Sequence, residues 1–189
     1  DRFRIYMKNA PKFNAVGLPD FSGVKMRDNP IYGAFLKALN ASTHPLPSSA
    51  VFGALEKGVV EASAWATNGL KGLKWDKFLR HAVDADFYRT DLGWIMNLDK
   101  WNGLSAKAKG IIQNSVIEQE VINAAQLSAM AVKEKATLIK EGMKFHAVPA
   151  KDKYLKMAVD SAYERMIARL KKAGRPTAHV AKLRAAFQQ

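Results

Sequence analysis

Arg27 is the residue of this chain whose type and surroundings are best suited to bind a ligand. Apolar and charged residues alternate over residues 24–27, which predicts a short strand. Asn29 and Pro30 suit the N-cap and first position of a helix, and apolar residues recur at helical spacing over 31–39. Arg27 would then lie beside a helix N-terminus, where free N–H groups favour an anion, and its guanidinium could hold a carboxylate through two parallel hydrogen bonds. The alternative is a surface arginine at a strand end.

A second strand end is predicted to lie beside the first. Residues 42–47 read as an edge strand, residues 50–57 as a helix, and residues 59–65 as a further strand. Because a helix separates them, the strand over 59–65 should run parallel to the strand that ends at Arg27. In open α/β sheets, ligands bind outside the carboxyl ends of the strands. The pattern therefore brings Arg27 and Trp65 to one edge of a sheet.

Four segments carry a family resemblance that extends from about residue 21 to about residue 120. They read DFSGVKMR, AFLKAL, PLPSSAVFGALEKGVVEASAW and GWIMNLDKWNGLSAKAK. In this order and spacing they resemble the carboxyl-terminal part of the solute-binding subunit of a tripartite ATP-independent periplasmic (TRAP) transporter. The resemblance implies a periplasmic, two-lobed α/β ligand-binding protein. In such a protein Arg27 grips the carboxylate of a small organic acid, which is then delivered to a membrane permease. The sequence shows no nucleophile with a base, no paired carboxylates at a cleft and no phosphate loop, so we expect neither enzymatic activity nor a cofactor.

The resemblance also implies four further ligand-binding residues. Arg4, on a strand predicted with one buried face, matches a second polar contact, although it could equally be the solvent face of that strand. Ser63 and Trp65 belong to the family's cleft, and we expect the Trp65 ring to form a wall against the ligand's carbon skeleton. The alternative for Trp65 is a core position. Tyr88 lies where one branch of the family has a cleft aromatic, and the alternative is an exposed turn tyrosine.

The predicted fold class is α/β, a periplasmic-binding-protein-like lobe with a parallel or mixed sheet flanked by helices, together with a long connecting helix and C-terminal helices. Residues 1–92 form the second, C-terminal ligand-binding lobe. Residues 93–142 comprise a strand that crosses back toward the other lobe and a long helix that Ser105 begins as its N-cap. Residues 143–189 return to the second lobe as a strand and the C-terminal helices.

The family's full chain is considerably longer and opens with a first lobe for which this sequence has no counterpart, so we expect that lobe to be missing here. The long helix should then leave part of its apolar face bare. The residues most at risk are Val116, Ile117, Val121 and Ile122. Exposed apolar surface of this kind marks an interface or an aggregation hazard. We therefore expect either self-association or a first lobe supplied as a separate chain, and weak carboxylate binding by this part alone.

Composition limits which functions other than carboxylate binding the chain could have. The chain has 189 residues, 30 Lys and Arg against 17 Asp and Glu, a net charge of +13 and no cysteine. The sequence contains no run of eighteen apolar residues, so no membrane-spanning helix is predicted. The positive charge is compatible with a second hypothesis, a basic protein that binds nucleic acid or an anionic surface. The basic residues are scattered, however, and form no stripe with stacking aromatics, so we expect no nucleic-acid partner. The four histidines are isolated in sequence, which predicts no metal site. An unrecognised enzyme acting on organic acids, with Arg27 as clamp, is the remaining rival.

Overall fold

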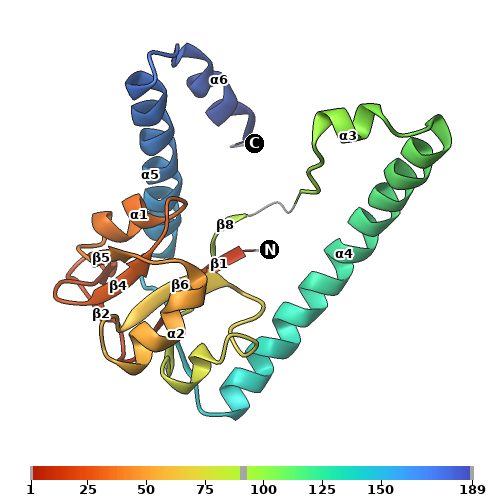
Figure 1. Cartoon of the computed structure of the whole chain (residues 1–189). Coiled ribbons are helices and arrows are strands. Elements are labelled where there is room, and N and C mark those ends of the chain that lie inside the picture. Colours follow the sequence, from red (N-terminus) through yellow and green to blue (C-terminus); the bar gives the residue numbers. More distant parts are fainter. Residues whose placement is uncertain (1, 90–92, 188–189) are drawn as a thin grey trace.

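The structure is a computed structural model. Its main element is a seven-stranded mixed sheet (Figure 1). The structure describes residues 2–89 and 93–187. The strands of the sheet are β1 (Arg2–Met7), β4 (Lys25–Asp28), β5 (Ser42–Pro45), β6 (Ala62–Ala66), β7 (His81–Val83), β8 (Phe87–Arg89) and β9 (Lys144–His146). A separate two-stranded ribbon pairs β2 (Lys12–Phe13) with β3 (Pro19–Asp20).

The strand order is β5-β4-β6-β1-β7-β9, with β8 also paired to β1. β4 runs parallel to both β5 and β6, as the strand–helix–strand pattern predicted. β5 is an edge strand, which is also confirmed. β1 instead runs antiparallel to β6, β7 and β8, while β7 and β9 are parallel. The carboxyl ends of β4 and β6 therefore lie beside the amino end of β1.

The helices cover both faces of this sheet. They are α1 (Gly33–Ala38), α2 (Ser48–Glu56), the 3-10 turn η1 (Trp75–Lys77), α3 (Leu98–Asn102), α4 (Ala106–Lys140), α5 (Lys151–Lys172) and α6 (Ala178–Phe187). One core contains Phe35 of α1 and Tyr154 of α5, and the other contains Val51 of α2, Trp75 and the end of α4 at Leu138. None of these helices combines the length and apolar content needed to cross a membrane.

Strand β1 corrects one expectation. A strand with a single buried face was predicted, but all its residues from Phe3 to Met7 are buried. β1 occupies the middle of the sheet, between β6 and β7, so both of its faces meet a core. Arg4 and Tyr6, which alternation placed on a solvent face, therefore point into the interior beside the second core. The solvent-face alternative for Arg4 is wrong.

The crossing strand predicted around Ile95 is also absent from the described residues. Residues 93–97 form no strand, and Trp94 and Ile95 are 81% and 98% exposed. Residues 90–92, the start of the predicted strand, lie outside the described residues. A strand is stabilised by hydrogen bonds to a neighbouring backbone, and none of the described strands pairs with this segment.

Helix α4 is the long helix that the sequence predicted. The Ser105 hydroxyl accepts a hydrogen bond from the Ala108 N–H, 3.2 Å away, so the predicted N-cap is confirmed. Its 35 residues make a rod of about 52 Å. Leu138 is its only buried residue, and Figure 1 shows α4 and α5 leaving the sheet in diverging directions. Val121 is 72% exposed, so the expected bare apolar face is present.

Candidate ligand-binding site

The Arg27 side chain lies at the carboxyl end of β4 and is only 4% exposed. Its Nε donates a hydrogen bond to the carbonyl oxygen of Leu46, 2.9 Å away, and its Nη1 donates to the hydroxyl of Tyr32. That hydroxyl in turn donates to the carbonyl oxygen of Ala64, 2.7 Å away on β6. Strand β6 and the turn before α1 thus hold the guanidinium in one orientation.

The predicted helix N-terminus beside Arg27 begins later than expected. The Asn29 side chain accepts the backbone N–H of Ile31 at 2.9 Å, so it caps a turn, and the regular helix starts only at Gly33. Six residues of helix give little dipole, and the first turn is occupied by Tyr32, which is fully buried. The predicted helix start at Pro30 is therefore wrong, and Arg27 is oriented by the hydroxyl of the N-cap residue Tyr32 and by the carbonyl of Leu46.

No carboxylate of a described residue lies within ion-pair distance of Arg27. A guanidinium has five N–H donors, and its two hydrogen bonds to described residues leave the others uncommitted. Burial raises the pKa of Tyr32 above its ordinary value, although the Arg27 charge opposes this, so the phenol stays neutral and does not balance the cation. A buried cation without a counter-ion is unfavourable, and an anionic ligand would supply the missing charge.

Trp65 forms an aromatic surface beside this cation. The Arg27 Cζ lies 5.9 Å from the centre of the Trp65 ring, and the ring packs edge-to-face on Trp75 with 4.9 Å between centroids. The Trp65 side chain is half-buried, and its indole N–H makes no hydrogen bond to a described residue. The arrangement offers a flat apolar wall and a free donor next to an uncompensated guanidinium.

Arg4 is the neighbour of Trp65 across the β1–β6 pair, but its charge is already balanced. Its Nε donates to Asp86 at 2.6 Å, its Nη2 lies 3.9 Å from Asp84, and its guanidinium lies 5.1 Å from the Phe145 ring centre. Arg4 is 6% exposed, similar to Arg27. The two buried arginines therefore differ in their partners: Arg4 is paired with carboxylates of the protein, whereas Arg27 has no carboxylate partner among the described residues.

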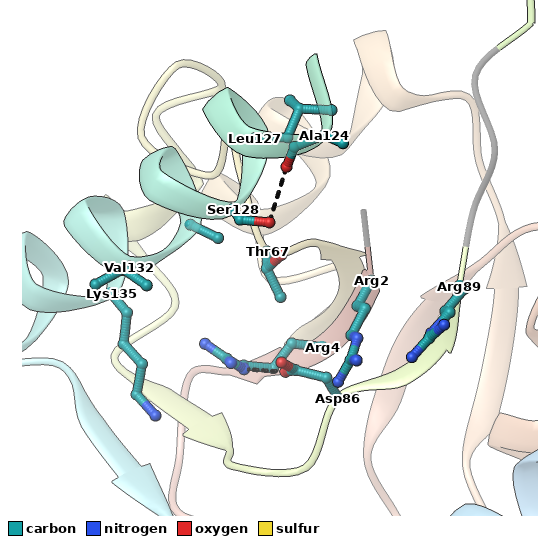
Figure 2. Close-up of a pocket in the computed structure, with 11 residues that line it drawn as sticks. Arg2, Arg4, Thr67, Asp86, Arg89, Ala124, Leu127, Ser128, Val132 and Lys135 are labelled. Carbon is teal, nitrogen blue, oxygen red and sulfur yellow. Dashed lines mark hydrogen bonds and ion pairs between the residues drawn. The ribbon is translucent and has the colours of Figure 1, made fainter. Parts of the chain in front are cut away.

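Arg4 also lines a cavity of about 510 Å³ between the sheet and α4 (Figure 2). In Figure 2 the side chains of Arg2, Arg4 and Arg89 gather around Asp86, and Lys135 approaches from α4 on the other side. The remaining lining residues are Thr67, Ala124, Leu127, Ser128, Ala131 and Val132. The lining holds four cationic side chains and the acidic Asp86, and Asp84 pairs with Lys135 at 2.7 Å and with Arg4 at 3.9 Å, so part of this positive charge is balanced by the protein's own carboxylates.

The other predicted site residues lie deeper or elsewhere. Ser63 pairs with Arg27 in the β4–β6 register, but it is fully buried and its hydroxyl donates to Ala64 O at 3.1 Å. Tyr88 lines a second cavity, of about 820 Å³, against α5 and α6, where its hydroxyl donates to Ala158 O at 2.9 Å. Burial raises the pKa of Tyr88 to about 12. The structure thus groups Arg27, Ser63 and Trp65, places Arg4 beside them, and keeps Tyr88 apart.

Sequence reasoning missed two features. Tyr32, which orients Arg27, was hidden in the predicted helix, although its place two residues after Pro30 put it in the turn next to the strand end. The expectation of isolated histidines was wrong, because His81 and His146 come together across β7 and β9 with 2.9 Å between ring nitrogens. No group of three His, Cys, Asp or Glu side chains within residues 2–89 and 93–187 is placed to hold a metal ion.

The structure is thus a mixed α/β lobe in which a buried arginine without an anionic partner among the described residues lies beside an aromatic ring at the carboxyl ends of β4 and β6. The particular family follows from comparison with known proteins. The model of the bacterial extracellular solute-binding protein family 7 (DctP) matches residues 14–170, and the chain belongs to this family. The resemblance to TRAP solute-binding subunits is thereby confirmed.

Relatives of known structure share the fold. A TRAP solute-binding protein from Desulfovibrio salexigens with bound orotic acid superposes with a TM-score of 0.75 at 20% identity, covering 96% of this chain and 58% of that one. One from Desulfovibrio desulfuricans with bound sn-glycerol-3-phosphate gives 0.72 at 19% identity, covering 95% and 55%. One from Pseudomonas putida F1 with bound D-glucuronate gives 0.71 at 17% identity, covering 89% and 54%.

Among curated proteins, a monocarboxylate 2-oxoacid-binding periplasmic protein of Nostoc sp. (strain PCC 7120) is 25% identical over 133 residues. The match covers 66% of this chain and 35% of that protein. The chain thus spans about a third of the curated relative and little more than half of the solved structures. The predicted α/β lobe is confirmed at the level of the fold.

Proposed function

We propose that this chain is part of an extracytoplasmic, periplasmic solute-binding protein that captures a small organic carboxylate and delivers it to the membrane permease of a TRAP transporter. Residues 1–92 contribute the second ligand-binding lobe, residues 93–142 connect toward the other lobe, and residues 143–189 return to the second lobe. The proposal is supported by family membership and by the ligands of the structural relatives, which include orotic acid and D-glucuronate.

The observation that carries the proposal is the contrast between Arg27 and Arg4. Both are buried at the same edge of the sheet, but Arg4 has Asp86 at 2.6 Å and Arg27 has no anionic partner among the described residues. Leaving a guanidinium buried and unpaired costs free energy, and a bound carboxylate recovers it through charge-assisted hydrogen bonds. Arg27 is thus the proposed anchor, with Trp65 as the wall against the ligand's carbon skeleton.

Arg4, Ser63 and Tyr88 take supporting places in this proposal. Arg4 would supply a second polar contact to the ligand from the neighbouring cavity, while its charge is balanced by Asp86 and Asp84. The Ser63 hydroxyl donates to the Ala64 carbonyl oxygen, which also accepts from the Tyr32 hydroxyl, so Ser63 would act on Arg27 only through Tyr32. Tyr88, which lines the larger second cavity, would contact only a ligand that extends well beyond the anchor.

A thermal-shift screen of organic acids tests the proposal. Each acid, including orotate, D-glucuronate and several 2-oxo acids, is paired with its uncharged amide. An acid that binds the native state raises the melting temperature, and its amide should not, because the amide cannot balance the Arg27 charge. The rival nucleic-acid function predicts no response to any acid and DNA binding that falls steeply with salt. That pair of results would overturn the proposal.

A further inference from the structure

Glu134 of α4 is half-buried, and its carboxylate binds the backbone of the loop that follows β6, residues 67–74. Its Oε2 accepts a hydrogen bond from the Gly69 N–H at 2.7 Å, and its Oε1 accepts one from the Lys71 N–H at 3.1 Å. Within the described part of the chain, no lysine or arginine forms an ion pair with Glu134. The charge of this carboxylate is therefore committed to two N–H groups of one loop.

The 67–74 loop lies against the Trp65 ring. Gly69 has a φ of 92°, which residues with a side chain rarely adopt, and a Cβ at this position would lie 3.7 Å from the Trp65 Nε1. The carbonyl oxygen of Leu70 accepts the Trp75 N–H at 3.3 Å, and Trp65 packs on the Trp75 ring. The Trp65 indole N–H donates to no described residue. Packing against these neighbours therefore sets the orientation of the ring.

Two weaker contacts join the same loop to α4 on either side of Glu134. The Asn68 Nδ2 donates to the carbonyl oxygen of Leu127 at 3.1 Å, and the Lys71 ammonium pairs with Glu141 just after the helix ends. The first is a single hydrogen bond between neutral groups, and the second is exposed and screened by water. Hydrogen bonds to a carboxylate are stronger, so Glu134 is the main attachment of the loop to α4.

We propose that Glu134 is a positioning residue for the ligand site. Its carboxylate fixes the 67–74 loop, and the loop fixes the Trp65 ring beside Gly69 and, through its contact with Trp75, on the neighbouring ring. The orientation of α4 thereby sets the position of the aromatic wall next to Arg27. The inference rests on the proposed function, because Trp65 bounds a ligand only if a carboxylate binds at Arg27.

A nuclear magnetic resonance spectrum of the chain labelled with ¹⁵N at its tryptophan indoles tests the proposal without any ligand. The chain has four tryptophans, and Trp65→Phe identifies the Trp65 signal. Glu134→Ala should shift that signal and leave the signal of Trp94, which is 81% exposed, unchanged. Glu134→Gln keeps one acceptor oxygen and should shift it less. Glu120→Ala, at an exposed carboxylate of the same helix, is the matched control and should leave the Trp65 signal in place.

Titration with an acid identified by the thermal-shift screen then measures the effect on binding. Glu134→Ala should weaken acid binding severalfold, Glu134→Gln less, and Glu120→Ala not at all. If Glu134→Ala does not fold, Glu134→Gln decides both measurements. An unshifted Trp65 signal, or an unchanged affinity in a variant whose Trp65 signal shifts, would overturn the proposal. If the unmodified chain binds no acid, the proposed function fails, whereas the spectrum without ligand still decides whether Glu134 positions Trp65.

Discussion

The sheet and helix α4 were equally visible in the sequence, yet they differ in what covers them. The sheet has helices on both faces, and Ile5, Tyr6 and Phe35 are fully buried. Helix α4 has 35 residues with a regular apolar pattern, but only Leu138 is buried. Periodicity thus predicts an element and the face that could be buried, whereas burial depends on whether a partner surface is present.

The largest difference between the two regions should appear in stability. Phe35 packs on Phe87 and Tyr154 with ring centroids 4.9 and 5.0 Å away, so Phe35→Ala should reduce the free energy of unfolding by about 3–5 kcal/mol. Val121 is 72% exposed, and Val121→Ala should change it by less than about 0.5 kcal/mol. Urea denaturation measures both. Both variants are compared at a protein concentration low enough that the chain is monomeric, and a large loss in Val121→Ala under that condition would show that another part of the same chain covers α4.

The second prediction concerns self-association through the exposed apolar residues of α4 and of the segment before α3. Trp94, Ile95, Ile117 and Val121 are all more than 60% exposed, and surface of this kind favours self-association. We expect a concentration-dependent increase in mass by analytical ultracentrifugation. Val121→Lys should shift the population toward monomer, and Lys25→Ala, on the packed lobe, should not. A monomer that binds a carboxylate with micromolar or tighter affinity would contradict the expected incompleteness of this part.

Tryptophan fluorescence should separate the two regions further. In a variant that keeps only Trp65, addition of a bound acid should change the emission, because the ring lies 5.9 Å from the Arg27 Cζ. Trp94 is 81% exposed and lies far along the chain from this site, so Trp94→Phe in the otherwise unmodified chain should leave the ligand-induced change in emission unaltered. If the Trp65 emission stays unchanged while calorimetry reports binding, Trp65 does not contact the ligand and has only a structural role in packing against Trp75.

The smallest effect is expected where α6 meets α5. Asp160 accepts hydrogen bonds from Lys156 and Arg184, and these lower the pKa of its carboxyl below the ordinary value of 3.8. The folded state therefore favours the charged form, so this contribution to stability is present above the unfolded pKa of 3.8 and is lost as the pH falls through the lower pKa of the folded state. Asp160→Asn should lower the melting temperature slightly at pH 7, and the difference from the unmodified chain should become smaller as the pH is lowered into the acid range. An equal decrease at pH 7 and in the acid range would show that the charge is irrelevant.

Much of the fold could be predicted because local signals agreed with the final structure. Alternation around Met26, the cap at Ser105 and the parallel order of β4 and β6 are all local or depend on one crossover rule. The predicted strand at Ile95 failed because a strand also needs a neighbour. One-sided burial of β1 failed because alternation does not tell whether a strand is central.

The candidate site was predictable only in part. Arg27 and Trp65 were placed at one edge by strand order, and the structure brings them together. Tyr32 could not be recognised as the residue that orients Arg27, since that contact depends on where the helix begins. The pairing of His81 with His146 joins residues 65 positions apart and follows from sheet order, which no local pattern reveals.

Calorimetric titration of an acid identified by the screen, into the chain and into Arg27 variants, tests the central claim most directly. Removing one partner of a buried charge pair costs about 2–5 kcal/mol, so Arg27→Ala should weaken binding by about 30-fold or more. Arg27→Lys should bind more weakly than the unmodified chain, since it loses the planar fork, and Lys25→Ala, at an exposed position of the same strand, should bind normally. Unchanged affinity in Arg27→Ala would contradict the account.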